Sequence, residues 1–175
     1  SLLISALGQI ENVASAVTMD FKEPGNLIYL VGTTYDELGG SHWADIQGVI
    51  GGIVPRVRPE SAMLLYRQIH ELIKAGLVRS CHDLSEGGLA VSLAESAFAG
   101  GYGATCDLGT VPTEGDLDDI SRLFSESNSR LILEIKPEDQ QRVEELLKNI
   151  PHAAIGVVSN EPRLIVLSVN EQIII

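Results

Sequence analysis

The residues best suited to chemistry lie between Arg79 and Gly103. His82 and Asp83 end a short segment that is predicted to be a strand, and Ser85-Glu86-Gly87-Gly88 follows them. Apolar residues then recur at helical spacing, so the stretch is predicted to form a strand, a tight loop and a helix. Ser85 is a residue type that favours helix N-caps, and Glu86 suits the positive end of a helix.

Two glycines in the first turn of a helix need a reason, because each costs about 1 kcal/mol against alanine in a helix interior. Without Cβ atoms, Gly87 and Gly88 would let an anionic ligand approach the amides of the helix N-terminus. Asp83, at the end of the strand, could hold a divalent cation that also binds a phosphate. A structural alternative stands beside this interpretation: the glycines only permit close helix-to-strand packing, and Asp83 caps the loop.

The triplet Cys81-His82-Asp83 is not predicted to be catalytic. Neighbours on a strand point to opposite faces, so Cys81 and His82 cannot act as a nucleophile and base pair. The spacings typical of zinc sites, of Walker loops and of dinucleotide-binding loops are absent from the sequence. What remains is a carboxylate beside a glycine-rich helix start, which suits metal-bridged phosphates.

Two further polar stretches adjoin predicted strands. Gly39-Gly40-Ser41 follows the apolar run Leu27–Val31, and its glycines either bring amides to a ligand or form a flexible surface turn. Residues 125–130 precede the predicted strand Leu131–Ile135, and they either contact a polar ligand or form an ordinary loop.

Hydrophobic periodicity predicts the remaining elements. The clearest is a helix that begins at Pro59 and stops at Gly76, with an apolar stripe formed by Ala62, Leu65, Tyr66, Ile69, Leu72 and Ile73. Strands are expected at 1–8, 104–108, 153–158 and 164–169, helical segments at 11–17, 117–124 and 137–148, and a loop at 44–55. This irregular alternation predicts an α+β or α/β domain with a mixed sheet covered by helices.

Chain length, net charge and cysteine count limit the possible classes of function. A chain of 175 residues favours one domain, residues 1–175, and the net charge of −12 argues against a nucleic-acid partner. Two cysteines predict free thiols, and with neither a signal peptide nor an 18-residue apolar run we expect a cytoplasmic protein without a membrane partner. Ser1 and the apolar run Ile173–Ile175 suggest a piece of a longer chain.

The motifs resemble a known family. His82–Leu89 with Ala94-Glu95 is similar to the C-terminal domains of the aminoimidazole-ribonucleotide-synthetase superfamily. Val17–Asn26 and Asp36–Ser41 narrow the resemblance to the phosphoribosylformylglycinamidine synthases, specifically to the second of two C-domains in the synthetase subunit. Three motifs in the right order cover nearly the whole chain.

The resemblance implies a three-layer α/β/α fold, partly ferredoxin-like, packed against N-terminal domains of the same full-length chain that carry most catalytic residues. It also implies an ATP-dependent ligase that converts formylglycinamide ribonucleotide to the amidine with ammonia from a glutaminase subunit. No catalytic residue is assigned to this chain, and alone it is expected to have no ligase activity.

Site residues carried over by the resemblance are Asp83 for Mg²⁺ and Ser85 for the phosphates of an auxiliary ATP or ADP, with the helix start at Gly87 and Gly88. Contacts to substrate or phosphate are expected from six further residues: Gly39, Gly40, Ser41, Glu126, Ser127 and Asn128. Family members commonly have Asp where this chain has Glu86. The first C-domain of the family has a Glu-Ser-Gln substrate contact whose counterpart here ends in Asn128 instead of Gln. The alternative function is a structural module that holds neighbouring domains and partner subunits and whose site has decayed.

Overall fold

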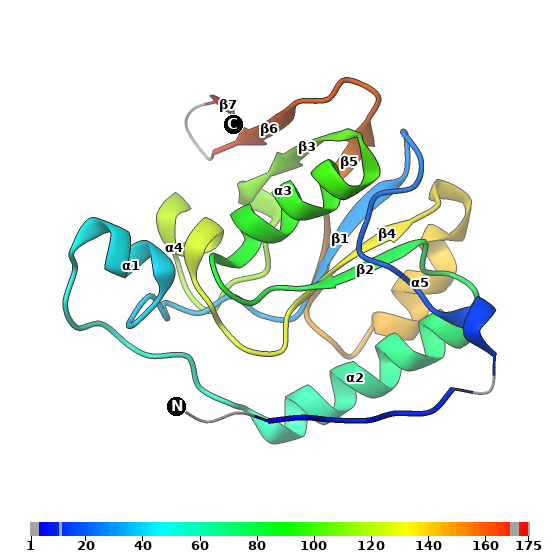
Figure 1. The fold of residues 1–175 in the computed structure, drawn as a ribbon, viewed down its shortest axis with the longest axis horizontal. Helices are drawn as coiled ribbons and strands as arrows, with labels where there is room; N and C mark the ends of the chain where they lie inside the picture. Colours follow the sequence, from blue (N-terminus) through cyan, green and yellow to red (C-terminus); the bar gives the residue numbers. More distant parts are fainter. Residues whose placement is uncertain (1–3, 11, 169–171, 175) are drawn as a thin grey trace.

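A mixed seven-stranded sheet forms the centre of the computed structural model, which describes residues 4–10, 12–168 and 172–174 (Figure 1). The strand order is β2-β4-β1-β5-β3-β6-β7, and β3 and β6 form the parallel pair among otherwise antiparallel neighbours. The strands are β1 (Leu27–Val31), β2 (Ser80–Asp83), β3 (Gly103–Asp107), β4 (Leu131–Ile135), β5 (His152–Ser159), β6 (Leu164–Leu167) and β7 (Gln172–Ile174).

Helices cover both faces of this sheet. One face packs against α3 and α4 and the other against α2 and α5, which confirms the α+β class and the three layers (Figure 1). The helices are α1 (His42–Gln47), α2 (Pro59–Lys74), α3 (Gly88–Gly100), α4 (Asp119–Phe124) and α5 (Gln140–Leu147), with 3₁₀ turns η1 (Val13–Ser15), η2 (Leu108–Thr110) and η3 (Pro137–Asp139). Within the described residues, no helix is long and apolar enough to cross a membrane.

The central strands are apolar on both sides because two separate cores use them. In β1, Ile28 and Leu30 pack into the core beneath α3, whereas Tyr29 and Val31 pack into the core beneath α2 and α5. Side chains alternate between faces along a strand, so a strand buried on both faces reads as a continuous apolar run. The predicted bounds of β1 and β4 are confirmed.

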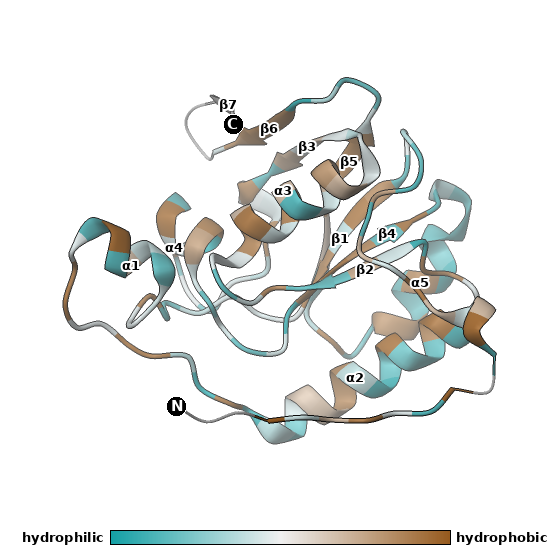
Figure 2. Cartoon of the chain, viewed as in Figure 1, coloured by the Kyte–Doolittle hydropathy of each residue, from teal (hydrophilic) through white to brown (hydrophobic). Residues whose placement is uncertain are grey.

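Helix α2 follows its predicted pattern with one exception. Its buried residues recur every three or four positions, at Ala62, Leu65, Ile69 and Leu72, and Figure 2 shows hydrophilic and hydrophobic residues interleaved along the helix. Tyr66 was expected in the apolar stripe, but it is 49% exposed and its hydroxyl donates to Ser129 Oγ at 3.2 Å. A tyrosine at the edge of a stripe can keep its polar end in water.

Two predicted segments differ from the structure. The strand expected at 1–8 is wrong for residues 4–8, which are irregular and exposed, while residues 1–3 lie outside the described part. The loop expected at 44–55 begins only after α1, which Ser41 caps by accepting from the Ala44 amide at 3.1 Å and which Gly48 ends at φ +67°. Serine at an N-cap starts a helix locally, and the prediction assigned Ser41 only to a ligand.

The segment 22–26, the second half of the Val17–Asn26 motif behind the resemblance, is held by the buried carboxylate of Glu134 on β4. Its oxygens accept from the Lys22 amide at 2.8 Å, the Glu23 amide at 3.0 Å and Asn26 Nδ2 at 2.6 Å. Glu134 is fully buried, and these donors satisfy a charge that would otherwise be costly to bury. This motif therefore has a structural role.

Candidate functional site

Asp83 lies at the end of β2 with its side chain 69% exposed. The Ser85 hydroxyl donates to Asp83 Oδ2, and this hydrogen bond holds the pKa of the Asp83 carboxyl below its usual value, against the opposing effect of partial burial. The group is therefore a carboxylate at neutral pH and faces solvent, as a ligand for a cation must.

His82 links this carboxylate to α3. Its Nδ1 lies 3.4 Å from Asp83 Oδ1, and its Nε2 lies 2.7 Å from Glu95 Oε2. Cys81 packs on the other side of the sheet, against the core beneath α2, and burial raises the pKa of its thiol to about 11. The two side chains point to opposite faces, so the rejection of a Cys81–His82 pair is confirmed.

A pocket of about 340 Å³ opens beside Asp83, and its charge is negative. Its lining comprises His82, Asp83, Ser85, Glu86, Ser92 and Glu95. Among the described residues, no cluster of three or more His, Cys, Asp or Glu side chains could by itself hold a metal ion. Mg²⁺ commonly uses one or two carboxylates and completes its shell with water and phosphate oxygens, so Asp83 fits one position of such a shell.

Helix α3 begins later than the sequence predicted. Its N-cap is Gly87, at φ +77°, and not Ser85, whose hydroxyl is directed to Asp83. Gly88 has φ +62°, and a Cβ there would lie 2.4 Å from the Ser125 carbonyl oxygen. Its amide donates to the Ser85 carbonyl at 3.1 Å. Gly88 therefore permits the start of α3 to pack closely against the chain at Ser125. This supports, for Gly88, the alternative in which the glycines serve packing and not ligand binding.

The three glycine and polar motifs meet at Glu126. Its Oε1 accepts from the Gly87 amide at 2.9 Å and from the His42 amide at 3.0 Å. Ser41 caps the same end of α1. A carboxylate at a helix N-terminus is stabilised as an external anion would be. In this structure the Gly87 amide is therefore already paired with the carboxylate of Glu126. The spacing of residues in the sequence did not predict this hydrogen bond.

The other predicted contact residues lie in different environments. Gly39 donates its amide to the Ile53 carbonyl at 2.8 Å, whereas Gly40 is exposed at φ +74°. Ser127 is fully buried and accepts from the Tyr35 amide at 3.1 Å. Asn128 lines a separate cavity of about 140 Å³. Asn128 is thus not brought together with Asp83.

Sequence reasoning missed Arg130, which organises the 125–130 cluster from inside. It is 1% exposed and donates to the Thr34 hydroxyl at 3.0 Å and to the carbonyls of Ser125 and Ser127. Burial lowers the pKa of its guanidinium to about 10, and the charges of Glu37 and Glu126 partly offset this. The position of Arg130, directly before an apolar strand, was the sequence feature that could have predicted its burial.

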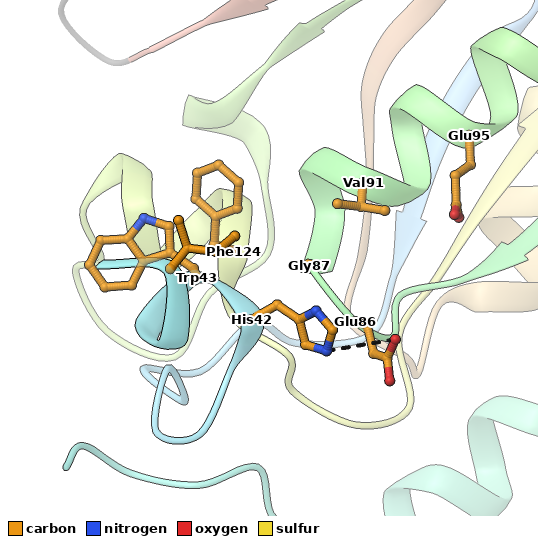
Figure 3. A pocket seen from close by; sticks show the side chains of 8 residues that line it. His42, Trp43, Glu86, Gly87, Val91, Glu95 and Phe124 are labelled. Atoms are coloured by element: carbon orange, nitrogen blue, oxygen red, sulfur yellow. Dashed lines mark ion pairs between the residues drawn. The ribbon is translucent and has the colours of Figure 1, made fainter. Parts of the chain in front are cut away.

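A second, mainly apolar cleft of about 310 Å³ adjoins the acidic pocket (Figure 3). Trp43 comes from α1, Phe124 from α4 and Val91 from α3. At its rim, His42 Nε2 lies 3.7 Å from Glu86 Oε2. Glu86 and Glu95 line both cavities, so the two are neighbours.

Comparison with known proteins finds relatives of the same fold. The phosphoribosylformylglycinamidine synthase subunit PurL of Alkaliphilus metalliredigens is 44% identical over 163 residues, which cover 91% of this chain and 21% of that protein. Thermotoga maritima PurL in complex with FGAR has the same fold, with a TM-score of 0.81 and 24% identity over 92% of this chain and 28% of that one. Its ATP complex gives a TM-score of 0.77 at 24% identity, covering 92% and 26%.

The chain spans about a fifth of the length of the curated relatives it matches. The model of one domain family, described as AIR synthase related protein, C-terminal domain, matches residues 23–168. That range contains the strands β1 to β6, the helices α1 to α5 and the convergence at Glu126. The chain therefore belongs to the family of AIR-synthase-related C-terminal domains.

Proposed function

We propose that this chain is one domain of a phosphoribosylformylglycinamidine synthase. That enzyme is an ATP-dependent ligase of purine biosynthesis, and it converts formylglycinamide ribonucleotide to the amidine with ammonia from a glutaminase partner. The name of the relatives, and the fold shared with PurL structures that hold ATP or FGAR, support this assignment. Asp83 and Ser85 contribute to a magnesium–nucleotide site that another domain completes.

One observation carries the proposal: Asp83 is exposed at the mouth of an acidic pocket and kept ionised by Ser85. Three carboxylates repel a phosphate, so an anionic ligand can enter this pocket only together with a cation. Mg²⁺ would supply the positive charge that joins carboxylate to phosphate. Asp83 holds the cation, and Ser85 fixes the orientation of Asp83.

Gly87 and Gly88 enter the proposal as the turn that follows Ser85, in which the Gly88 amide donates to the Ser85 carbonyl. A phosphate that contacts the Gly87 amide has to replace the carboxylate of Glu126 there. We therefore expect metal to bind first and phosphate second, since the metal neutralises the pocket before the anion arrives.

The experiment uses the full-length protein. Nucleotide released on denaturation is identified by mass spectrometry, and Mg²⁺ is measured in the same sample. We expect nucleotide and Mg²⁺ in the wild type and loss of both in Asp83→Asn. Asp116→Asn, which changes a fully exposed carboxylate elsewhere, is the control and should retain them. Equal nucleotide content in wild type and Asp83→Asn would remove the site role of Asp83.

A structural module with a decayed site is the second candidate. It is favoured by the internal pairing of both glycine amides, with Glu126 on Gly87 and the Ser85 carbonyl on Gly88. On this reading, the wild-type full-length protein releases no nucleotide that depends on Asp83. The same mass spectrum therefore separates the two candidates.

A further inference from the structure

His82 lies between two carboxylates of the acidic pocket. Its Nε2 lies 2.7 Å from Glu95 Oε2 on α3, and its Nδ1 lies 3.4 Å from Asp83 Oδ1 on its own strand. The His82 side chain is 14% exposed, so the surrounding domain restricts how the ring can turn. The proposed nucleotide site uses Asp83 and Ser85, and it leaves the contact between His82 and Glu95 without a role.

The Asp83 carboxylate is held through both of its oxygens. Oδ2 accepts from the Ser85 hydroxyl, and Oδ1 faces His82 Nδ1. The Ser85 hydrogen bond, and more weakly the interaction with His82, lower the pKa of the Asp83 carboxyl. The main chain of Asp83 is fixed as well, because its carbonyl accepts from the Ser92 hydroxyl at 2.9 Å. Contacts to both oxygens set the plane of a carboxylate, which a single contact leaves free to rotate.

Glu95 orients the imidazole ring of His82. Nε2 and Glu95 Oε2 are 2.7 Å apart, and the hydrogen between them belongs to the ring because an ionised carboxylate can only accept. Nε2 therefore donates to Glu95, and this hydrogen bond fixes the direction in which Nδ1 points. Since Nδ1 faces Asp83 Oδ1, Glu95 acts on Asp83 through the ring.

We propose that Glu95 and His82 are positioning residues, which hold the Asp83 carboxylate in the orientation that binds a divalent cation. The inference rests on the proposed function and gives roles to two residues beside that site. Partners that hydrogen-bond a metal-binding side chain typically change the metal affinity by about 10–100-fold when they are substituted. The cation concerned is a hard one, for which carboxylate oxygens are preferred ligands.

Glu86 provides the matched comparison, because it lines the same pocket and has the same side chain as Glu95. Figure 3 shows the two carboxylates apart from one another, and that of Glu86 lies 3.7 Å from His42 Nε2. Both acids attract a cation through the negative potential of the pocket, but it is Glu95 that holds His82. Gln or Ala at either position removes the same charge. The difference between Gln and Ala therefore isolates the contribution of the hydrogen-bond acceptor.

The test is titration of the full-length protein with Mn²⁺ alone, which prefers the same oxygen ligands as Mg²⁺ and is counted by electron paramagnetic resonance. The site is defined as the Mn²⁺ binding that Asp83→Asn abolishes. We expect Glu95→Ala to weaken this binding about 10-fold relative to Glu95→Gln, whose amide oxygen still accepts from Nε2. Glu86→Ala and Glu86→Gln should bind Mn²⁺ equally. In a His82→Ala background, the difference between Glu95→Ala and Glu95→Gln should disappear, because the ring that transmits it is gone.

Equal Mn²⁺ binding by Glu95→Ala and Glu95→Gln would overturn the proposal, because charge alone would then explain the effect of Glu95. A difference that persists in the His82→Ala background would also overturn it and make Glu95 a direct ligand. If His82→Ala does not fold, His82→Asn replaces it, since the shorter amide does not reach Glu95. Mn²⁺ binding that Asp83→Asn leaves unchanged would instead refute the proposed function, and this inference with it, so the two failures are distinguishable.

Discussion

Two carboxylates on neighbouring strands, Glu134 on β4 and Asp83 on β2, have opposite environments. Glu134 is fully buried and accepts three hydrogen bonds from the segment 22–26. Asp83 is largely exposed, and its partners are Ser85 and His82. Asp83 lies in one of the motifs that carried the resemblance, and Glu134 holds a second such motif in place. Of the two carboxylates, only Asp83 has oxygens left to bind a ligand.

The difference shows how to separate structural from functional acids. A buried carboxylate is tolerated when donors saturate it, and removing it then leaves those donors unpaired. An exposed carboxylate beside a pocket contributes little to stability and can bind a cation. Substitutions at buried, closely packed positions should therefore cost more stability than substitutions at exposed ones, with the largest effect at Glu134 and the smallest at Glu144.

Glu134→Ala should lower the free energy of unfolding by about 3–5 kcal/mol, because it leaves two amides and the Asn26 side chain without their charged acceptor. Chemical denaturation measures the loss. Glu134→Gln, which keeps one acceptor oxygen, should cost less. A loss below about 1 kcal/mol for the alanine variant would show that water replaces the carboxylate without penalty.

Gly88→Ala should destabilise the domain by about 2–4 kcal/mol, since it combines a left-handed backbone with overpacking. The new Cβ would meet the Ser125 carbonyl at 2.4 Å. Gly40→Ala is the matched control, because Gly40 has φ +74° but open space around it. Thermal unfolding of both variants separates strain from crowding, and equal costs would contradict the packing role of Gly88.

Asp83→Asn should change the free energy of unfolding by less than about 1 kcal/mol, because its contacts are near the surface. Denaturant titration of the variant beside Glu134→Gln makes the comparison direct. A loss as large as that expected for Glu134→Ala would make Asp83 a structural acid and weaken its assignment to a metal.

The pH dependence should show the smallest effect, at Glu144 on α5. The Tyr29 hydroxyl donates to Glu144 Oε1 at 2.6 Å and lowers the pKa of that carboxyl. The resulting stability is present above the unfolded-state pKa and is lost as pH falls through the lower folded-state pKa. Thermal unfolding between neutral and acid pH should therefore be less pH-dependent in Glu144→Gln. An identical slope in both proteins would contradict this coupling.

Local patterns predicted the regular elements well. The bounds of β1 and β4, the start of α2 at Pro59 and the opposite faces of Cys81 and His82 follow from periodicity and turn chemistry over a few residues. The start of α1 was missed because Ser41 was assigned to a ligand instead of a helix cap. The start of α3 was displaced because Ser85 pairs with Asp83.

The sequence by itself determined the central strands, the covering helices and the family motif around Asp83, since each depends on residues close together along the chain. Only the tertiary structure decided that Glu126 occupies the Gly87 amide across 39 positions, and that Glu134 holds the segment 22–26 across more than 100. Hydrogen bonds between distant segments leave no periodic signal, because they depend on where the folded chain brings their atoms together.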